Sequence, residues 1–284
     1  LNIYEILLIF ERNYMEQVIL GFDLGTGGIK ATAYNNKFLT ISSSFVEYKT
    51  YYSHMYYQEQ HPDDWWRAMR DSIQIINSDV GLNNFDIRGI SISGQSLVSI
   101  PIDYTGNKLL DSIPIWSDQR AKSQANDFFK KVDNDEWYLK TGNGFPEPCY
   151  PIFKIMYMKE NQPEVFRKTK IFLGSKDYIN FLLTNKIFTD HSYASGIGAY
   201  DLLKKDYIDK YLSSAGLNRE LFPKIVQSHT IIGSVTEKAA KYLNINAGIP
   251  VACGGVDNSC MALGTIGSTV GNAFISLGTS SWIP

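Results

Sequence analysis

The sequence FDLGTGG at residues 22–28 and the related sequence ISLGTSS at residues 275–281 indicate the fold of this chain. In each copy a short apolar run leads into Leu-Gly-Thr and then into small residues, as expected of a strand that turns tightly around a phosphate group. One Gly-rich loop alone is weak support, because Gly-Thr-Gly also occurs in hairpins that bind nothing. The repeat favours two related half-domains that face one nucleotide.

The residues after the first loop indicate which kind of phosphate site it forms. Residues 29–34, IKATAY, alternate with period two and are rich in β-formers. A dinucleotide fingerprint or a P-loop continues instead into an amphipathic helix, and the sequence contains no Gly-x-x-x-x-Gly-Lys-Ser/Thr motif. We therefore predict a β-hairpin whose glycines supply positive φ and let backbone N–H groups approach phosphate oxygens.

Asp23 lies directly before this turn, at the phosphate end of its strand. A carboxylate repels phosphate, so we expect Asp23 to hold a hydrated Mg²⁺ that bridges phosphate oxygens. The alternative is an aspartate that only caps the turn.

Composition sets broad limits on the class of protein. The chain has 284 residues, of which 44% are hydrophobic and 20% are charged, which is typical of a globular protein with one large or two small domains. The net charge of −2 gives no electrostatic reason to expect nucleic acid or anionic membranes as partners. The three cysteines lack metal-ligand spacing and fit a reduced, cytoplasmic protein.

The amino-terminal residues contain an apolar run that is much shorter than the roughly 20 residues of a membrane span. They also lack a signal-peptide cleavage pattern. Met15 directly precedes the first expected strand, so we predict that it is the natural start and that residues 1–14 are an extension outside the fold.

The remaining pattern predicts a meander followed by a crossover. Residues 18–24, 29–34 and 38–48 have strand character and are expected to be antiparallel neighbours. Pro62-Asp63-Asp64 opens a helix with an apolar face, and residues 87–93 form a strand after it. Three antiparallel strands, a helix and a parallel strand form the βββαβ unit of the ribonuclease H-like α/β architecture with a mixed sheet, which actin and sugar kinases share.

With these features the chain resembles the FGGY carbohydrate kinases from Met15 to Pro284. The resemblance rests on six segments in the family's order: residues 21–30 (GFDLGTGGIK), 93–96 (SGQS), 114–121 (PIWSDQRA), 174–178 (GSKDY), 254–258 (GGVDN) and 276–282 (SLGTSSW). It implies a two-domain enzyme that uses ATP and Mg²⁺ to phosphorylate a hydroxyl of a small sugar or polyol. The implied ATP-binding residues are Gly25, Thr26, Gly27, Gly28 and Lys30 in the first loop and Gly278, Thr279 and Ser280 in the second.

Asp257 follows an apolar strand that ends in two glycines and precedes a predicted helix. A carboxylate at such a junction can accept the proton of a sugar hydroxyl and orient its oxygen toward the γ-phosphate. It matches the family's catalytic base. The alternative is an aspartate that caps the helix N-terminus.

Residues 116–120 combine an aromatic ring, an acid, an amide and a guanidinium, a mixture suited to the faces and hydroxyls of a sugar. Trp116 and Asp118 are the leading candidate substrate contacts, and Gln119 and Arg120 are included with them. Arg120 has the alternative of a purely structural ion pair with a neighbouring acid.

Gln95, Ser96 and Asn258 complete the substrate pocket that the resemblance implies. Xylulokinases read Gly-Gln-Met-His where this chain has Leu97 in the last position, and glycerol kinases carry Arg-Glu at the positions of Gln95 and Ser96. Asn258 is the xylulokinase-like residue. A ketopentose such as xylulose is therefore the first candidate, with glycerol, erythritol, ribulose and gluconate as alternatives.

The second Leu-Gly-Thr loop lies close to the last residue. We expect residues 15–265 to form the sugar-binding domain and residues 266–284 to begin a truncated ATP-binding domain. An unpaired apolar strand at residues 273–277 invites a homodimer. The competing functions are an ATPase switch or sugar sensor of the same fold and a non-catalytic sugar-binding remnant.

Overall fold

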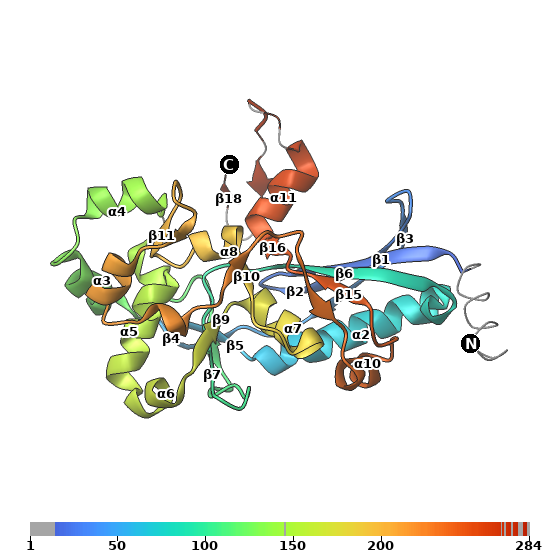
Figure 1. The fold of residues 1–284 in the computed structure, drawn as a ribbon, viewed down its shortest axis with the longest axis horizontal. Helices are drawn as coiled ribbons and strands as arrows, with labels where there is room; N and C mark the ends of the chain where they lie inside the picture. Colours follow the sequence, from blue (N-terminus) through green and yellow to red (C-terminus); the bar gives the residue numbers. More distant parts are fainter. Residues whose placement is uncertain are drawn as a thin grey trace.

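A seven-stranded mixed sheet runs through the computed structural model of this chain (Figure 1). Six of its strands follow the order β14-β15-β6-β1-β2-β3, and the short β16 pairs with β6. The structure describes residues 15–144, 146–267, 269, 271–273, 275–277 and 281–282. The predicted extension at residues 1–14 lies outside this set, as do Gly278, Thr279 and Ser280 of the second loop.

The core of the sheet has the predicted βββαβ order. Strands β1 (Gln17–Leu24), β2 (Gly28–Asn35) and β3 (Thr40–Glu47) pair antiparallel with their neighbours. Helix α2 (Pro62–Val80) then crosses over, and β6 (Asp86–Gly94) pairs parallel with β1. The α/β fold with a mixed sheet is thereby confirmed.

Two details of this region differ from the prediction. The third strand begins at Thr40 instead of residue 38, because Phe38 has a φ of 58° and belongs to the turn after β2. A hairpin that was not expected, β4 (Tyr51–His54) and β5 (Tyr57–Gln60), follows β3 and pairs with β8 (Ile113–Pro114) in a separate small sheet. This hairpin contributes to the candidate site described below.

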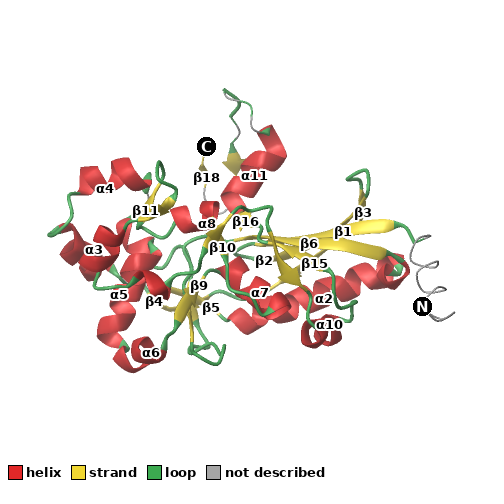
Figure 2. Ribbon diagram, viewed as in Figure 1, coloured by secondary structure: helices red, strands yellow, loops and turns green. Residues whose placement is uncertain are grey.

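Helix α2 lies against one face of the sheet, below it in Figure 2, whereas α11 (Asp257–Ile266) projects on the opposite side. Alternate residues of β1 are buried, among them Leu20 and Leu24, while Asp23 between them is exposed. Helix α2 supplies the facing apolar stripe of Trp65, Met69, Ile73 and Ile76, each at most 1% exposed. Burial of one such side chain stabilises the fold by about 1.5–3 kcal/mol. The period-2 strand thus has one face in the core and one face free for polar side chains.

The remaining strands and helices of the sheet domain extend this arrangement. Helices α7 (Ser175–Thr184) and α10 (Glu237–Leu243) pack beside α2. Strands β15 (Pro250–Ala252) and β14 (Ile231–Ser234) continue the sheet beside β6, and β14 is at its edge. The turn after β15 returns to β6 through β16 (Gly255–Val256) and leads directly into α11 (Asp257–Ile266).

A second core of aromatic residues lies at the other end of the molecule, on the left of Figure 1. Its helices are α3 (Lys122–Phe129), α4 (Asn134–Thr141), α5 (Pro151–Asn161), α6 (Pro163–Lys168) and α9 (Asp209–Ser214). The Phe153 ring contacts the Phe128 ring edge-on, with the ring centroids 5.2 Å apart, and the Trp137 ring at a tilt, with the centroids 6.3 Å apart. Aromatic pairs in this range stabilise a core beyond their burial alone.

Shorter elements complete the fold. They are β7 (Ile100–Ile102), β9 (Ile171–Leu173), β10 (Thr189–Asp190), α8 (His191–Ser195), β11 (Tyr200–Asp201), β12 (Asp206–Tyr207) and β13 (Ile225–Val226), with 3₁₀ turns η1 (Leu82–Asn84), η2 (Glu147–Cys149) and η3 (Arg219–Leu221). Within the described ranges, no helix combines the length and apolar character that crossing a membrane requires.

The carboxyl-terminal repeat forms a separate small pair of strands. β17 (Ser276–Leu277) pairs antiparallel with β18 (Ser281–Trp282), and neither joins the main sheet. Ile275, just before β17, is 64% exposed. The homodimer predicted from this strand stays a prediction.

Gly254 provides a test of how tightly the turn before α11 packs on β6. Its φ is +72°, and a Cβ atom there would lie 1.9 Å from the carbonyl oxygen of Ile92. We expect Gly254→Ala to lower the free energy of unfolding by about 4 kcal/mol, measured by denaturant titration. Gly264→Ala in α11 is the control, because its added methyl group meets nothing within 4 Å. Equal stability of the two variants would contradict the close approach.

Candidate functional site

The open face of the sheet carries a row of polar side chains at the ends of three strands. Asp23 of β1 lies opposite Lys30 of β2 on one side and opposite Ser93 of β6 on the other. The Ser93 hydroxyl donates to Asp23 Oδ1 at 2.9 Å. These three residues, with Cys260 of α11, help to line an open hollow of about 270 Å³. The sequence predicts Asp23 and Lys30 as phosphate-end residues, and the register explains why they are neighbours.

The glycine loop between β1 and β2 is a tight turn, as expected, but its glycines act differently. None of Gly25, Gly27 and Gly28 adopts the positive φ that the sequence predicts. Gly28 is instead required by close packing, because a Cβ atom would lie 2.6 Å from the Val46 carbonyl oxygen and 2.7 Å from the Phe45 ring. The turn is closed by a hydrogen bond from the Gly25 N–H to the carbonyl of Gly28, the first residue of β2, at 3.1 Å and without left-handed backbone at its glycines.

Tyr48 holds this glycine loop through two hydrogen bonds. Its backbone N–H donates to the carbonyl of Gly27 at 3.4 Å, and its hydroxyl donates to the carbonyl of Gly25. Burial, and then the nearby charge of Asp23, raise the pKa of the Tyr48 phenol well above its usual value. The phenol therefore keeps its proton at neutral pH and stays a donor.

Gln60, which sequence reasoning missed, joins the loop to its surroundings. Its side chain is fully buried at the end of β5 and makes four hydrogen bonds. The amide nitrogen donates to the Thr26 carbonyl at 2.7 Å and to the Thr50 hydroxyl at 2.8 Å. The amide oxygen accepts from Trp65 Nε1 at 3.0 Å and from Gln95 Nε2 at 2.8 Å. A lone Gln in an unexpected hairpin gives no sequence signal for such a role.

Gln95 and Ser96 lie where β6 ends, directly after the polar row. The Gln95 side chain is fully buried on Gln60, and its backbone carbonyl accepts from the hydroxyls of Ser175 and Tyr193. Gln95 Oε1 has no hydrogen-bond partner among the described residues, but the side chain is 0% exposed and presents no surface to a ligand in this conformation. Ser96 is half-buried beside it.

Trp116 and the glycine loop are in direct contact. Trp116 is half-buried, and its indole N–H donates to the Thr26 hydroxyl at 2.8 Å. Thr26 thus presents its carbonyl to Gln60 and its hydroxyl to Trp116. The structure brings the predicted sugar-binding ring and the predicted phosphate loop to one place.

Asp118 and Arg120 form a buried ion pair. Arg120 Nε and Nη2 donate to the two Asp118 oxygens at 2.9 and 2.7 Å, and Nη2 also donates to Glu59 at 2.5 Å. The Arg120 guanidinium lies 3.9 Å from the Tyr57 ring centroid. Arg120 therefore forms the structural ion pair with a neighbouring acid that was the alternative to a sugar contact. Asp118 is 0% exposed and has no surface in this conformation with which to contact a sugar.

Gln119 differs from its buried neighbour Asp118 in its surroundings. It is exposed and, with Arg120, lines a hollow of about 570 Å³ that also includes Tyr56, Tyr57 and Pro148. The five-residue cassette is thus divided between two environments. Trp116 faces the glycine loop, and Gln119 faces this larger hollow.

Lys154 connects the two segments predicted to bind substrate and was assigned no chemistry from sequence. Its ammonium is buried in α5 and donates to the carbonyls of Leu97 at 3.1 Å and Ile115 at 2.5 Å. Burial lowers the pKa of Lys154 to about 8, against the opposing effect of Asp118. Helix α5 packs into the second core, and Lys154 is a buried polar bridge within it.

Asp257 is the first residue of α11 and is half-buried. The N-cap position belongs to Val256, but the Asp257 carboxylate accepts from the Asn258 N–H at 2.8 Å and so satisfies one free N–H group of the first turn, in part as the alternative expected. Burial raises the pKa of Asp257 to about 6, with the charge of Asp23 adding to the effect and the Asn258 backbone N–H opposing it. Asn258 is exposed on the next position of the helix. A carboxylate with this pKa can exchange a proton near neutral pH.

The described residues contain no cluster of three or more metal-ligating side chains. Mg²⁺ does not need one, because it keeps several waters and is commonly held by one or two carboxylates together with phosphate oxygens. Asp23 is an exposed carboxylate beside Lys30 and fits this mode of binding.

Gln60→Ala tests whether this residue holds the site together. We expect the free energy of unfolding to fall by about 3 kcal/mol, since the change leaves the Trp65 N–H and the Gln95 amide buried without partners. Gln58→Ala, on the same strand but half-buried, is the matched control and should cost less than about 1 kcal/mol. Chemical denaturation of both variants measures this, and similar losses would argue against a special role for Gln60.

Comparison with known proteins identifies the family of this chain. Residues 18–264 match the FGGY family of carbohydrate kinases, N-terminal domain. The chain is 30% identical over 268 residues to a xylulose kinase of Bacillus subtilis, covering 93% of this chain and 52% of the relative. A gluconate kinase from Lactobacillus acidophilus has a TM-score of 0.87 at 26% identity over 94% of this chain and 54% of its own.

A ligand-bound xylulose kinase from Lactobacillus acidophilus superposes equally well, with a TM-score of 0.86 at 26% identity over 94% of this chain and 54% of its own. The chain spans about half the length of these relatives. The match covers both the polar row on the sheet and the turn that carries Asp257. The chain therefore belongs to the FGGY family of carbohydrate kinases, and residues 18–264 are its N-terminal domain.

Proposed function

We propose that residues 15–265 are the sugar-binding domain of an ATP-dependent kinase that transfers the γ-phosphate to a hydroxyl of a small carbohydrate. The observation that carries this proposal is the pairing of the polar row on the open sheet face with Asp257. Asp23 lines the open hollow together with Cys260, which lies one helical turn after Asp257 in α11, and the charge of Asp23 adds to the effect of burial on the pKa of Asp257. A phosphate site and a proton acceptor are thus adjacent, as phosphoryl transfer requires.

In this mechanism Asp257 accepts the proton of the attacking hydroxyl. With a pKa of about 6 it is ionised at neutral pH, yet basic enough to take a proton. Lys30 and the loop of residues 25–28 would contact the phosphates, with the Gly25 N–H kept within the loop by its hydrogen bond to the Gly28 carbonyl at 3.1 Å, and Asp23 would hold Mg²⁺. The bound ion supplies neutralisation of the charge that develops on the phosphate oxygens. Gly278, Thr279 and Ser280 remain the predicted second phosphate loop.

The substrate class rests on the sugar side of the site. Xylulose is the first candidate, because curated relatives at about 28–30% identity are named xylulose kinases. Leu97 argues for considering a second candidate substrate class, because this apolar residue occupies the position at which the xylulokinases that the chain resembles have a histidine. The Leu97 side chain has no donor or acceptor and is 9% exposed, so it cannot supply a hydrogen bond to a ketose hydroxyl. The similarity to a solved gluconate kinase makes a sugar acid that candidate.

Turnover on a panel of sugars tests the proposal. ADP release is followed with xylulose, ribulose, glycerol, erythritol and gluconate, with an FGGY C-terminal domain present from the same polypeptide or by fusion to that of a xylulose kinase relative. We expect one sugar to stimulate ADP release and Asp257→Asn to lower kcat by about 100-fold or more, because proton acceptance is lost. Asp127→Asn, an exposed residue of α3, is the control and should leave kcat unchanged.

The same assay separates the competing functions. ADP release that needs no sugar and is unchanged by Asp257→Asn would contradict the kinase and support an ATPase switch of the same fold. Sugar binding by calorimetry with no ADP release under any condition would support a non-catalytic sugar-binding remnant.

The stability of Asp257→Asn should depend on pH in a defined direction. The raised pKa means that the folded state binds a proton between about pH 6 and pH 4 that the unfolded state releases. Folding is therefore disfavoured by the ionised carboxylate above pH 6, and Asn removes this cost. We expect the variant to be more stable by about 1–2 kcal/mol at pH 7 and to lose the advantage below about pH 4. Thermal unfolding from pH 4 to 8 measures it; an advantage that is independent of pH would contradict the buried charge.

A further inference from the structure

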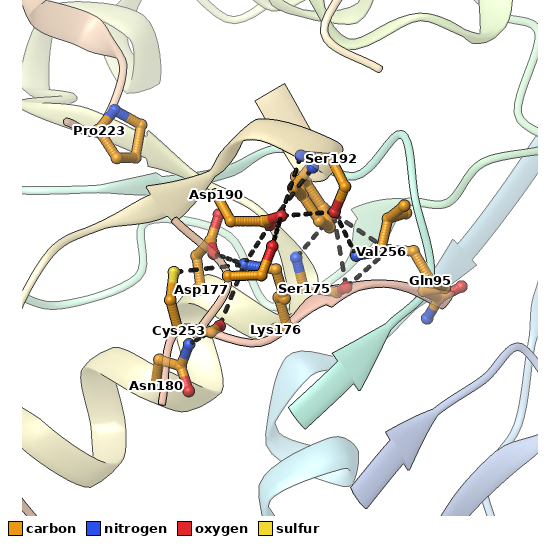
Figure 3. Close-up of polar contacts among 12 residues, drawn as sticks. Gln95, Ser175, Lys176, Asp177, Asn180, Asp190, Ser192, Pro223, Cys253 and Val256 are labelled. Atoms are coloured by element: carbon orange, nitrogen blue, oxygen red, sulfur yellow. Dashed lines mark hydrogen bonds and ion pairs between the residues drawn. The ribbon is translucent and has the colours of Figure 1, made fainter. Parts of the chain in front are cut away.

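A fully buried ionic cluster lies beneath the turn that carries Asp257 (Figure 3). Lys176 Nζ is 2.6 Å from Asp177 Oδ1 and 3.0 Å from Asp190 Oδ1, and all three side chains are at most 2% exposed. Burial raises the pKa of Asp177, while Lys176 and two serine hydroxyls help to lower that of Asp190 against its own burial. Buried ion pairs are poor stabilisers compared with apolar packing, so the cluster calls for another explanation.

The cluster holds the carbonyl of Cys253, just before the two glycines of the turn. Lys176 Nζ donates to this carbonyl at 3.3 Å, and Asn180 Nδ2 donates to it at 2.8 Å. Both donors come from α7, which packs against the sheet and does not belong to the turn. One end of the turn is therefore fixed to a helix of the core.

Asp190 fixes the other end through Ser192. Asp190 Oδ2 accepts from the Ser192 hydroxyl at 2.5 Å, and the Ser192 oxygen accepts from the Val256 N–H at 2.9 Å. A hydroxyl has one proton, so its donation to Asp190 leaves a lone pair directed at Val256. Val256 is the residue before Asp257 and the N-cap of α11. Figure 3 shows this path from Lys176 through Asp190 and Ser192 to Val256.

The glycines between these two anchors leave the turn little freedom. Gly254 has a φ of +72° and packs on the Ile92 carbonyl. A Cβ atom on Gly255 would lie 3.3 Å from Ser192 Oγ and 2.9 Å from Cys260 Sγ. The backbone thus approaches the Ser192 hydroxyl directly, and this hydroxyl connects Asp190 of the ionic cluster to the residue before Asp257.

We propose that Ser192, oriented by Asp190 and Lys176, is a positioning residue that sets the place of the Asp257 carboxylate for proton transfer. This inference rests on the proposed function of Asp257 as the base. Misplacement of a reacting group by about 1 Å can cost up to about 100-fold in rate, so an anchor one peptide bond away matters for the chemical step.

Ser192→Ala is the test, and Ser228→Ala is its matched control. The Ser228 hydroxyl donates to the same Asp190 Oδ2 at 2.8 Å but accepts nothing from the turn through its side chain. Each variant removes one hydroxyl donor to Asp190, whereas only Ser192→Ala removes the acceptor of the Val256 N–H. The sugar panel assay above supplies kcat and KM, and amide hydrogen exchange reports on Val256.

We expect Ser192→Ala to lower kcat at least tenfold with the sugar KM within about threefold, and to speed exchange of the Val256 amide. Ser228→Ala should keep kcat within about threefold and leave that amide protected. Equal kcat values in the two variants would overturn the proposal, as would a loss confined to KM. If Asp257→Asn has the same kcat as the wild type, the proposed function fails. Faster exchange of the Val256 amide in Ser192→Ala, but not in Ser228→Ala, would still establish the anchor. Unchanged exchange of that amide in Ser192→Ala would rule the anchor out.

Discussion

The parallel pairing of β6 with β1 is the constraint on which the rest of the structure depends. It places Ser93 beside Asp23, and the antiparallel partner β2 places Lys30 on the other side. Because α2, α7 and α10 cover one face of the sheet, this row stays on the open face. The turn that ends at Asp257 also pairs with β6, through β16. Strand β6 therefore sets the positions of both Asp23 and Asp257.

Two buried polar residues connect this strand end to the predicted sugar-binding segments. Gln60 binds the Thr26 carbonyl and the Gln95 amide, and Lys154 binds the carbonyls of Leu97 and Ile115. Neither side chain is exposed, so each acts on a ligand only through the backbone and side chains that it holds. The site is thus built from loops whose relative positions are set by hydrogen bonds in the core, which is how loops become precise enough for binding.

The sequence predicts the βββαβ order, the apolar face of α2 and the segments that carry the site, because periodicity and glycine turns are local signals. It does not predict the hairpin β4–β5, whose polar, aromatic sequence lacks the period of a buried strand. It also assigns positive φ to a glycine loop that has none, since close packing and left-handed backbone both favour glycine. Long-range contacts such as Lys154 with two carbonyls leave no pattern in one sequence. An ion pair of Arg120 with a neighbouring acid is an alternative that the sequence offers, and Asp118 fills that role, but the additional contact with Glu59 depends on the unexpected hairpin.

The most direct test of the central claim is a crystal structure of the chain, together with an FGGY C-terminal domain, bound to xylulose or gluconate, Mg²⁺ and a non-hydrolysable ATP analogue. The account predicts a sugar hydroxyl within about 3 Å of an Asp257 oxygen and pointing at the terminal phosphate, with Mg²⁺ on the Asp23 side. A sugar bound in the hollow beside Tyr56 and Pro148, with Asp257 out of reach of any hydroxyl, would contradict it.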